Sequence, residues 1–175
     1  MPATSLLRCV ALALAVGAAA PVPGRAQQPS PPGCADDVHH AFDYWIGAWV
    51  VRDSTGTELG RNTITSVSDG CALLEEWESA SGGSGRSLTF VERPTGEWRQ
   101  VWIGGDGGAL DLRGVPEDGV MVLSGDRQGR AGPVRDRVRW IPREDGKVEQ
   151  LWESSTDEGA TWSVVFRGFY EPRAG

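Results

Sequence analysis

From Ala48 onward, polar and apolar residues alternate in short segments, and turn-forming residues interrupt them roughly every eight to twelve positions. A period of two is typical of β-strands, because successive side chains point to opposite faces of a strand. The pattern predicts ten strands, at 48–55, 60–68, 71–79, 86–93, 97–104, 108–114, 119–125, 133–141, 147–155 and 161–170.

The breaks between these segments are short and most contain glycine, as in Asp69-Gly70 and Glu144-Asp145-Gly146. Connections of this length force neighbouring strands to be antiparallel. Sequential antiparallel strands form a meander, and closing the meander into a barrel removes both exposed edges. The pattern therefore favours an all-β, up-and-down barrel over a sandwich, which would need long Greek-key crossings.

One aromatic stretch, Phe42–Val51, leads into the first strand. It contains Trp45 and Trp49 on either side of Gly47, and glycine permits a sharp change of backbone direction. Each aromatic side chain brings a large apolar surface that must be buried. We expect this stretch to plug one end of the barrel, the alternative being an ordinary aromatic cluster in the core.

A short helix is expected over residues 36–45, just before the strands. The carboxylates of Asp36 and Asp37 suit a helix start, where they accept hydrogen bonds from unpaired amide groups. His39 and His40 lie in the same segment, but adjacent histidines point apart on a helix and no third ligand has suitable spacing. We therefore expect a capped, solvated helix and no metal site.

Residues 1–26 have the features of a secretory signal peptide. Arg8 precedes an apolar run that is too short to span a membrane, and small residues precede the expected cleavage after Ala26. Residues 27–33 are a proline-rich linker, and residues 34–175 are expected to form a single barrel domain. The expected product is secreted or periplasmic and soluble.

Cysteine usage agrees with an oxidising compartment. Cys9 would leave with the signal peptide, so that Cys34 and Cys71 remain. An even pair in a secreted protein is read as a disulfide, which would tie the N-terminal arm to the second hairpin. The alternative is two free buried thiols.

The chain is acidic, with a net charge of −7 that becomes more negative once Arg8 and Arg25 are removed. An acidic surface argues against partnership with nucleic acid and against anionic membranes. The charge is also explained by solubility alone.

Several strands combine aromatic residues with an isolated polar group on one face. One such face carries Trp98, Gln100 and Trp102, and another carries Val148, Gln150 and Trp152. The same alternation groups Leu73 with Glu75 and Trp77, and Phe166 with Trp162, Val164 and Tyr170. This composition is typical of a ligand cavity, and equally of a filled barrel core whose polar groups are satisfied.

In strand 71–79 either face carries a carboxylate into the barrel if it turns inward. The more apolar face carries Leu73, Glu75 and Trp77, and the other carries Leu74, Glu76 and Glu78. A buried carboxylate needs an arginine or several hydrogen bonds, or it takes up a proton. Candidate partners are Arg99, Arg137 and Arg139. A structural ion pair, a ligand-binding pair and a catalytic acid or base all remain open.

Ser155–Trp162 matches the Asp-box pattern S-x-D-x-G-x-T-W, which is well known from sialidases. We expect a structural hairpin here, in which Asp157 bonds turn amides, Gly159 takes a positive φ and Trp162 packs under the turn. A sialidase propeller would need several copies and a much longer chain. The sequence also lacks a Gly-x-Ser-x-Gly elbow, a P-loop and a dinucleotide fingerprint, so no cofactor is expected.

The stretch Phe42–Val51 resembles the hallmark F-D-[FY]-W-I-G-x-W of a family of secreted bacterial proteins of unknown function, the domain-of-unknown-function family numbered 1579. The resemblance extends through most of the domain, at 70–77, 98–102 and 150–155. That family is similar to the calycins, the lipocalin-like barrels, whose first strand begins with Gly-x-Trp. Gly47 and Trp49 match this signature.

The calycin resemblance implies one specific contact. In that superfamily, a basic residue on the last strand stacks over the tryptophan of the signature, and Arg167 is the matching position. Some barrels of this kind bind haem through a histidine. Here both histidines precede the first strand, so an axial ligand on the barrel wall is missing.

The main hypothesis is a non-enzymatic barrel that binds a small apolar or aromatic molecule. Its expected ligand-binding residues are Glu75, Trp77, Trp98, Gln100, Trp102, Gln150 and Trp152. One alternative is an enzyme that acts through Glu75 with an arginine partner, and another is a fully packed structural or interaction module.

Overall fold

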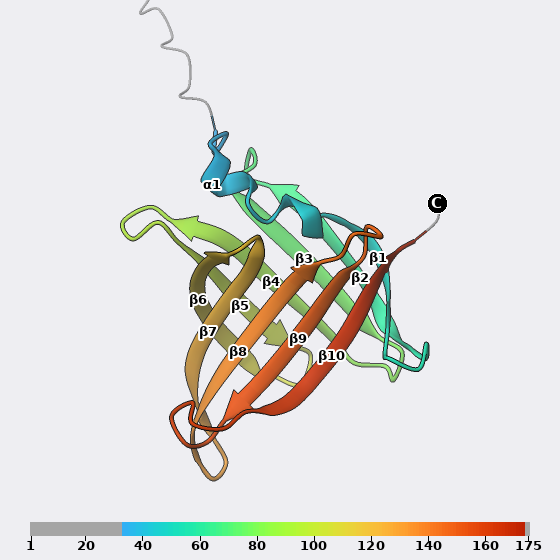
Figure 1. The fold of residues 1–175 in the computed structure, drawn as a ribbon, viewed down its shortest axis with the longest axis vertical. Helices are drawn as coiled ribbons and strands as arrows, with labels where there is room; N and C mark the ends of the chain where they lie inside the picture. Colours follow the sequence, from blue (N-terminus) through green and yellow to red (C-terminus); the bar gives the residue numbers. More distant parts are fainter. Residues whose placement is uncertain (1–32, 174–175) are drawn as a thin grey trace, which may run out of the picture. The chain divides into compact units, whose positions relative to one another are not determined.

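The computed structural model describes residues 33–173, which form ten antiparallel strands closed into one barrel (Figure 1). Each strand pairs with its neighbours in the chain, and β1 pairs with β10. The strands are β1 (Gly47–Arg52), β2 (Glu58–Val67), β3 (Ala72–Ser79), β4 (Ser84–Glu92), β5 (Glu97–Gly104), β6 (Ala109–Glu117), β7 (Val120–Gly129), β8 (Gly132–Pro142), β9 (Val148–Ser155) and β10 (Ser163–Pro172). The predicted ten-stranded up-and-down barrel is therefore confirmed.

The hairpin of β7 and β8 is longer than the sequence predicts. The polar run 126–129 has the composition of a loop, yet it continues β7 as far as Gly129, which pairs with Gly132. Opposite charges face each other across this extension, where Arg135 Nε lies 2.8 Å from Asp126 Oδ1. Cross-strand pairing thus makes this segment a strand although its local composition favours a loop.

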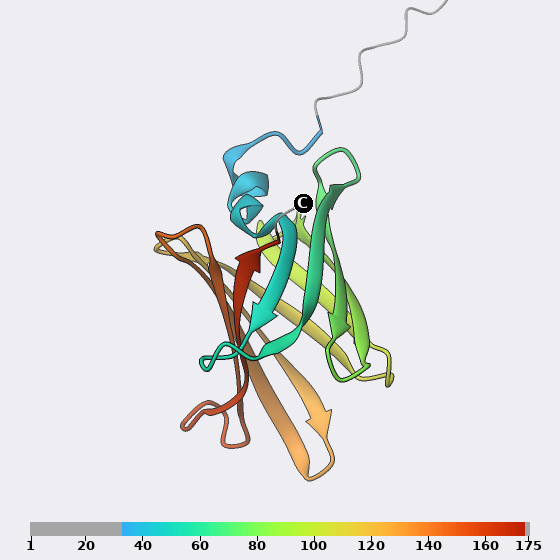
Figure 2. The ribbon, with the colours of Figure 1, turned by 90° about the vertical axis from the view of Figure 1, so that its right-hand side faces the viewer.

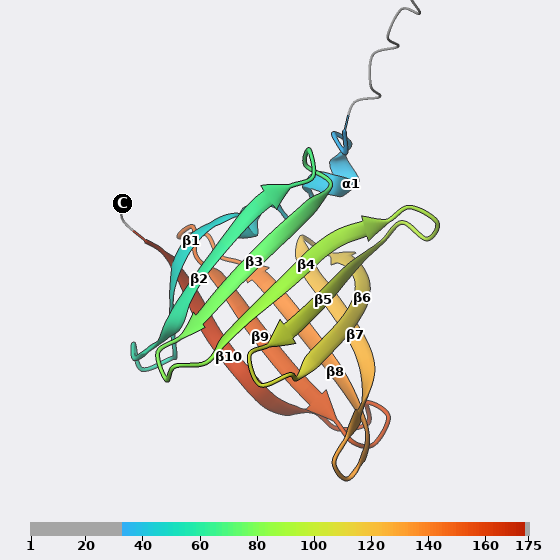
Figure 3. The same ribbon diagram turned by 180° about the vertical axis from the view of Figure 1, so that it is seen from behind.

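The seam between β1 and β10 closes the barrel. Four residues of β1 pair with β10, from Trp49 opposite Pro172 to Arg52 opposite Phe169. Outside the ladder, Arg52 Nε lies 3.2 Å from Glu171 Oε2. Figure 2 shows β1 and β10 side by side, and Figure 3, seen from behind, shows in its foreground the opposite wall with β2 to β5.

The expected helix over 36–45 is present in two pieces, α1 (Asp37–His40) and the 3₁₀ turn η1 (Asp43–Trp45). Asp36 caps α1, because its carboxylate accepts a hydrogen bond of 3.1 Å from the backbone N–H of His39. The break between the pieces lets Phe42 and Trp45 both point into the barrel, where each is fully buried.

The aromatic stretch plugs one end of the barrel, as the sequence predicts. The rings of Phe42 and Trp45 stack at 4.9 Å, and Phe42 also meets Trp98 at 5.9 Å and Trp140 at 5.2 Å. Tyr44 fastens the plug to the rim, because its hydroxyl donates a hydrogen bond of 2.8 Å to the Trp140 carbonyl. The aromatic residues therefore fill the interior at the end that α1 and η1 cover (Figure 2).

Gly47 and Trp49 occupy the start of β1, where they connect the plug to the wall. Gly47 has a φ of 154°, and a Cβ there would lie 3.2 Å from the Trp49 ring. The Trp49 indole N–H donates a hydrogen bond of 2.9 Å to the Trp45 carbonyl. Glycine is thus required both for the backbone conformation and for the close approach of the indole.

Cys34 and Cys71 form the expected disulfide, with their α-carbons 4.8 Å apart. The bridge ties the segment before α1 to the turn between β2 and β3, at the plugged end. The expected signal peptide and nearly all of the expected linker lie outside the described residues. Within residues 33–173, no helix is long and apolar enough to cross a membrane.

The hairpin between β9 and β10 has the geometry expected of an Asp-box. Asp157 accepts hydrogen bonds from both the N–H and the hydroxyl of Thr161, at 2.8 and 2.6 Å. Gly159 has a φ of 95°, and the ring of Trp162 lies close beneath it. The guanidinium of Arg137, on the neighbouring strand β8, lies 4.1 Å from the centre of the Trp162 ring. The motif therefore has a structural role in packing this hairpin against β8.

The disulfide is expected to stabilise the plugged end. Replacing both cysteines, Cys34→Ala with Cys71→Ala, should lower the free energy of unfolding by about 4 kcal/mol, because the bridge closes a long loop of the unfolded chain. Urea unfolding of both proteins measures the loss. A reductant should destabilise the wild type and leave the double variant unchanged; equal unfolding midpoints for the two oxidised proteins would contradict the expectation.

The Asp157 turn predicts a specific acid sensitivity. Hydrogen bonds from Thr161 and then Ser155 lower the pKa of Asp157 from 3.8 to about 2. A lowered folded pKa gives stability that is present above pH 3.8 and lost as the pH falls through about 2. The advantage of wild type over Asp157→Asn should therefore shrink over that range in thermal unfolding.

The matched control is Glu144→Gln, which changes an exposed acid in the turn between β8 and β9. A constant difference between wild type and Asp157→Asn from pH 5 to pH 2, or the same pH trend in the control, would remove the turn as the source of the effect.

Candidate functional site

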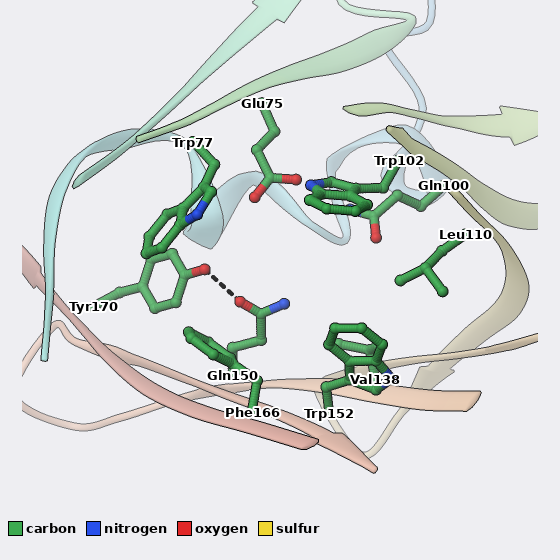
Figure 4. Close-up of a pocket in the computed structure, with 10 residues that line it drawn as sticks. All are labelled: Glu75, Trp77, Gln100, Trp102, Leu110, Val138, Gln150, Trp152, Phe166 and Tyr170. Carbon is green, nitrogen blue, oxygen red and sulfur yellow. Dashed lines mark hydrogen bonds between the residues drawn. The ribbon is translucent and has the colours of Figure 1, made fainter. Parts of the chain in front are cut away.

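A cavity of about 110 Å³ lies inside the barrel, beyond the plug (Figure 4). Residues from six strands line it: two each from β3, β5, β9 and β10, and one each from β6 and β8. The lining residues are Glu75, Trp77, Gln100, Trp102, Leu110, Val138, Gln150, Trp152, Phe166 and Tyr170. Aromatic and aliphatic side chains surround a few polar groups, which is the usual composition of a small-molecule site.

The structure brings together six of the seven residues expected to bind ligand: Glu75, Trp77, Gln100, Trp102, Gln150 and Trp152. Trp98 is the exception. It lies on the same face of β5 as Gln100 and Trp102, but nearer the plug, where its ring meets Phe42. For β5, alternation predicts correctly which side chains face inward, but it does not predict how far along the barrel axis each of them lies.

Glycines make room for the two tryptophans near the open end. Gly85 and Gly104 face each other across β4 and β5, and a Cβ on either would come within 2.5 to 2.7 Å of the Trp102 ring. Gly60 on β2 does the same for Trp77, at 2.6 Å. These absent side chains let the indoles lie flat over neighbouring strands instead of filling the centre.

Glu75 is 5% exposed and its carboxylate points into the cavity (Figure 4). Its two oxygens accept hydrogen bonds of 2.7 Å, one from the Asn62 amide and one from the Ser87 hydroxyl. Burial raises the pKa of this carboxyl, and the two hydrogen bonds oppose that shift only in part. The carboxyl is thus held among neutral donors.

The predicted arginine partners of Glu75 lie elsewhere. Arg99 pairs with Asp111 at 2.8 Å, while Arg137 and Arg139 both bind Glu153, at 3.0 and 2.9 Å. These arginines occupy odd-numbered positions on β5 and β8, whose odd positions face outward. Among the described residues, no salt bridge involves Glu75.

Gln100 extends the network on one side of Glu75. Its amide N–H groups donate to Ser87 and Thr89, at 3.3 and 3.2 Å. Ser87 passes the connection on to Glu75, so the hydroxyl both accepts from Gln100 and donates to the carboxylate. The amide oxygen of Gln100 is left directed at the cavity (Figure 4).

Tyr170 and Gln150 form the other side of the network. The Tyr170 hydroxyl donates to the Gln150 side-chain oxygen and accepts from Asn62 at 3.3 Å. Burial and then the nearby Glu75 raise the pKa of Tyr170 well above its ordinary value. Tyr170 also meets the Trp45 and Trp49 rings, at 6.5 and 6.2 Å, so it joins the plug to the cavity.

The expected stack of Arg167 on Trp49 is wrong. Arg167 projects from the outer face of β10, where its guanidinium lies 5.4 Å from the Phe169 ring and 2.7 Å from Glu149. Trp49 is buried on the inner face. Across residues 33–173, the cation–π contacts are this one and that of Arg137 over Trp162.

Sequence reasoning missed four lining residues: Leu110, Val138, Phe166 and Tyr170. Phe166 and Tyr170 share a predicted apolar face, but so does Val164, which is 61% exposed. A bulge between Val164 and Phe166 shifts the register against β9 and reverses the alternation. Leu110 and Val138 carry no signal beyond alternation, although each lies opposite a lining tryptophan.

The cavity opens toward the end opposite the plug. Trp77 and Trp102 also border an outer hollow of about 450 Å³ between the turn after β3 and the turn after β5. Gly82–Ser84 and Gly104–Asp106 form the rest of that hollow. The two indoles thus stand at the boundary between the inner cavity and the outer hollow.

The described part of the chain contains no group of three or more histidine, cysteine, aspartate or glutamate side chains arranged to hold a metal ion. Models of known protein families do not match the chain, and a search of curated proteins finds no relative.

The buried carboxyl predicts a stability that falls with pH. Since the pKa of Glu75 is raised in the folded state, wild type should lose stability as the pH rises above the ordinary value of 4.5 toward the folded pKa. Glu75→Gln removes this titration and keeps the side chain's size. Its stability relative to wild type should therefore increase with pH, as urea unfolding between about pH 4 and pH 8 would measure.

Glu76→Gln is the matched control, because Glu76 lies on the outer face of the same strand and pairs with Arg86 at 3.1 Å. If the Glu75→Gln difference stays constant with pH, or follows that of the control, then Glu75 is charged in the folded protein and the expectation fails.

Proposed function

We propose that this protein is a binding barrel for a small, mostly apolar molecule, held in the cavity around Glu75. The observation that carries the proposal is an interior space of about 110 Å³ with aromatic walls and polar atoms that point into it. Among the described residues, the Gln100 oxygen and the Gln150 amide nitrogen have no hydrogen-bond partner, because both amides bond through their other atom. They offer one acceptor and one donor to a ligand.

Cavity size limits the ligand. An apolar cavity of about 150 Å³ holds one benzene molecule, and typical drug-sized pockets are several times larger. The inner cavity, at about 110 Å³, therefore suits a group no larger than a single ring. A longer ligand would leave the inner cavity between Trp77 and Trp102 and continue into the outer hollow.

Binding is favoured over the alternative functions. The enzymatic alternative relies on an arginine partner for Glu75, and the hydrogen-bond partners of Glu75 are instead a neutral amide and a neutral hydroxyl. A purely structural barrel would have its centre packed, as the plugged end is around Phe42 and Trp45.

We also propose that the chain is a secreted member of the family that shares the Phe42–Val51 hallmark, and through it a calycin. Support comes from the barrel itself and from Gly47 and Trp49 at the start of β1. The Cys34–Cys71 disulfide fits an oxidising compartment outside the cytoplasm.

Titration with single-ring compounds of different charge, followed by calorimetry, tests the binding function. At least one should bind with a stoichiometry of one, and Trp102→Ala should weaken it about tenfold or more, because the indole supplies apolar contact at the cavity mouth. Trp102→Ala should still fold, since the ring lies beside an open space rather than in the plug.

Leu88→Ala is the control, because Leu88 is 47% exposed on the outer face of β4. It should bind as wild type does. If no compound binds to the folded protein, or if Trp102→Ala binds every ligand as tightly as the control, the cavity is not a binding site and a structural module is the better explanation.

A further inference from the structure

We propose that the cavity selects small organic cations, specifically amines whose ammonium group pairs with the Glu75 carboxylate while the apolar part lies among the aromatic rings. This inference rests on the proposed binding function and adds the charge and chemical class of the ligand. Three features of the interior support it: the contacts of Glu75, its contrast with a second interior carboxylate, and the aromatic walls.

The contacts of Glu75 suit a negative charge. The Asn62 amide N–H can only donate, and Ser87, which accepts from Gln100, directs its hydroxyl proton at the carboxylate. These neighbours stabilise the ionised form, yet they carry no charge. What the ionised carboxylate lacks in this buried setting is a cation.

Asp136 is a second buried carboxylate inside the barrel, and its contacts can be compared with those of Glu75. It is 1% exposed and accepts hydrogen bonds from Trp152 and Ser154, much as Glu75 does from its own neighbours. In addition, Arg127 reaches it from β7, with Nε 2.6 Å from Oδ2. Asp136 therefore has a cation from the chain itself, and the corresponding place beside Glu75 is cavity.

The walls of that space are suited to a cation. Five aromatic side chains line the cavity: Trp77, Trp102, Trp152, Phe166 and Tyr170. The face of an aromatic ring attracts positive charge, and recognition of ammonium groups by aromatic walls is a common use of this attraction. An anion would meet both the ring faces and the carboxylate unfavourably, so carboxylic acids are excluded as ligands.

The depth of the groups orients the ligand. Glu75 lies farther along β3 from the open end than Trp77, which borders the outer hollow. The ammonium group therefore enters first and the apolar part remains near the mouth. The acidic Asp106 in the outer hollow favours the approach of a cation over that of an anion.

Binding should release protons. The titratable group that faces Glu75 from the neighbouring strands is Tyr170 on β10, while Asn62 on β2, Ser87 on β4, Gln100 on β5 and Gln150 on β9 do not titrate. Asp136 on β8 lies behind Trp152 with its own arginine. Burial raises the pKa of Glu75, so an arriving ammonium group shifts the carboxyl toward its ionised form and expels a proton.

The experiment compares benzylamine, benzyl alcohol and benzoate, which share one ring and differ in charge, by calorimetry on the full-length protein. Benzylamine should bind at least about tenfold more tightly than benzyl alcohol, and benzoate should not bind. Repeating the benzylamine titration in buffers of different ionisation enthalpy measures the protons released. Its affinity should rise with pH, as long as the amine stays protonated.

Glu75→Gln should lose the preference for benzylamine over benzyl alcohol, whereas Glu76→Gln, altered on the outer face of the same strand, should keep it. Benzyl alcohol binding as tightly as benzylamine to wild type, or benzylamine binding without proton release at a pH where Glu75 is neutral, would overturn the cation proposal and leave the binding function intact. Failure of all three compounds to bind would overturn both. The wild-type comparison decides the matter even if Glu75→Gln does not fold.

Discussion

The interior width of a ten-stranded barrel is the constraint on which the rest of this structure depends. About eight strands enclose a space that side chains can just fill, and each further strand widens it. The chain meets this requirement with large residues and with a segment from outside the sheet. Phe42, just before η1, and Trp45, at its end, fill one end together with Trp98 and Trp140.

At the other end, no segment of residues 33–173 from outside the sheet enters the barrel, and the inward-facing residues determine what space remains. Tryptophans that lie against Gly85, Gly104 and Gly60 cover the wall without reaching the centre. The residual space therefore depends on glycines that lie directly under the two tryptophan rings. Its polar lining, centred on Glu75, is costly to bury, and hydrogen bonds from Asn62 and Ser87 offset part of that cost.

Much of the fold follows from alternation and turn residues, since the meander, the disulfide and the aromatic plug all depend on local pattern or on residue type. Details of the site depend on geometry that a pattern does not contain. Trp98 and Trp102 lie on the same inward face of β5 and differ only in their position along the barrel axis. Trp98 therefore contacts the plug, and Trp102 lines the cavity. The bulge before Phe166 turns Val164 to the outer face of the barrel, and no glycine or proline in this segment indicates a bulge from the sequence.

The predicted stacking of Arg167 on Trp49 is wrong for a reason that applies more widely. The resemblance assigned it a partner by analogy, whereas its odd-numbered position on β10 places it outside the barrel, against Glu149. The predicted ion pairs between Glu75 and an arginine are absent for the same reason, because the candidate arginines on β5 and β8 face outward. Parity along each strand, counted from a residue known to be buried, would have excluded both assignments.

The closing seam has a consequence for how the cavity comes into being. Nine of the ten ladders join strands that are consecutive in the chain, so they can form locally, one hairpin after another. The remaining ladder joins the first strand to the last and pairs, for example, Trp49 with Pro172. Asn62 on β2 bonds both Glu75 and Tyr170, so the polar network of the cavity spans this seam. The cavity therefore depends on the last strand of the chain, and a nascent chain that lacks β10 also lacks Phe166 and Tyr170 from the cavity wall.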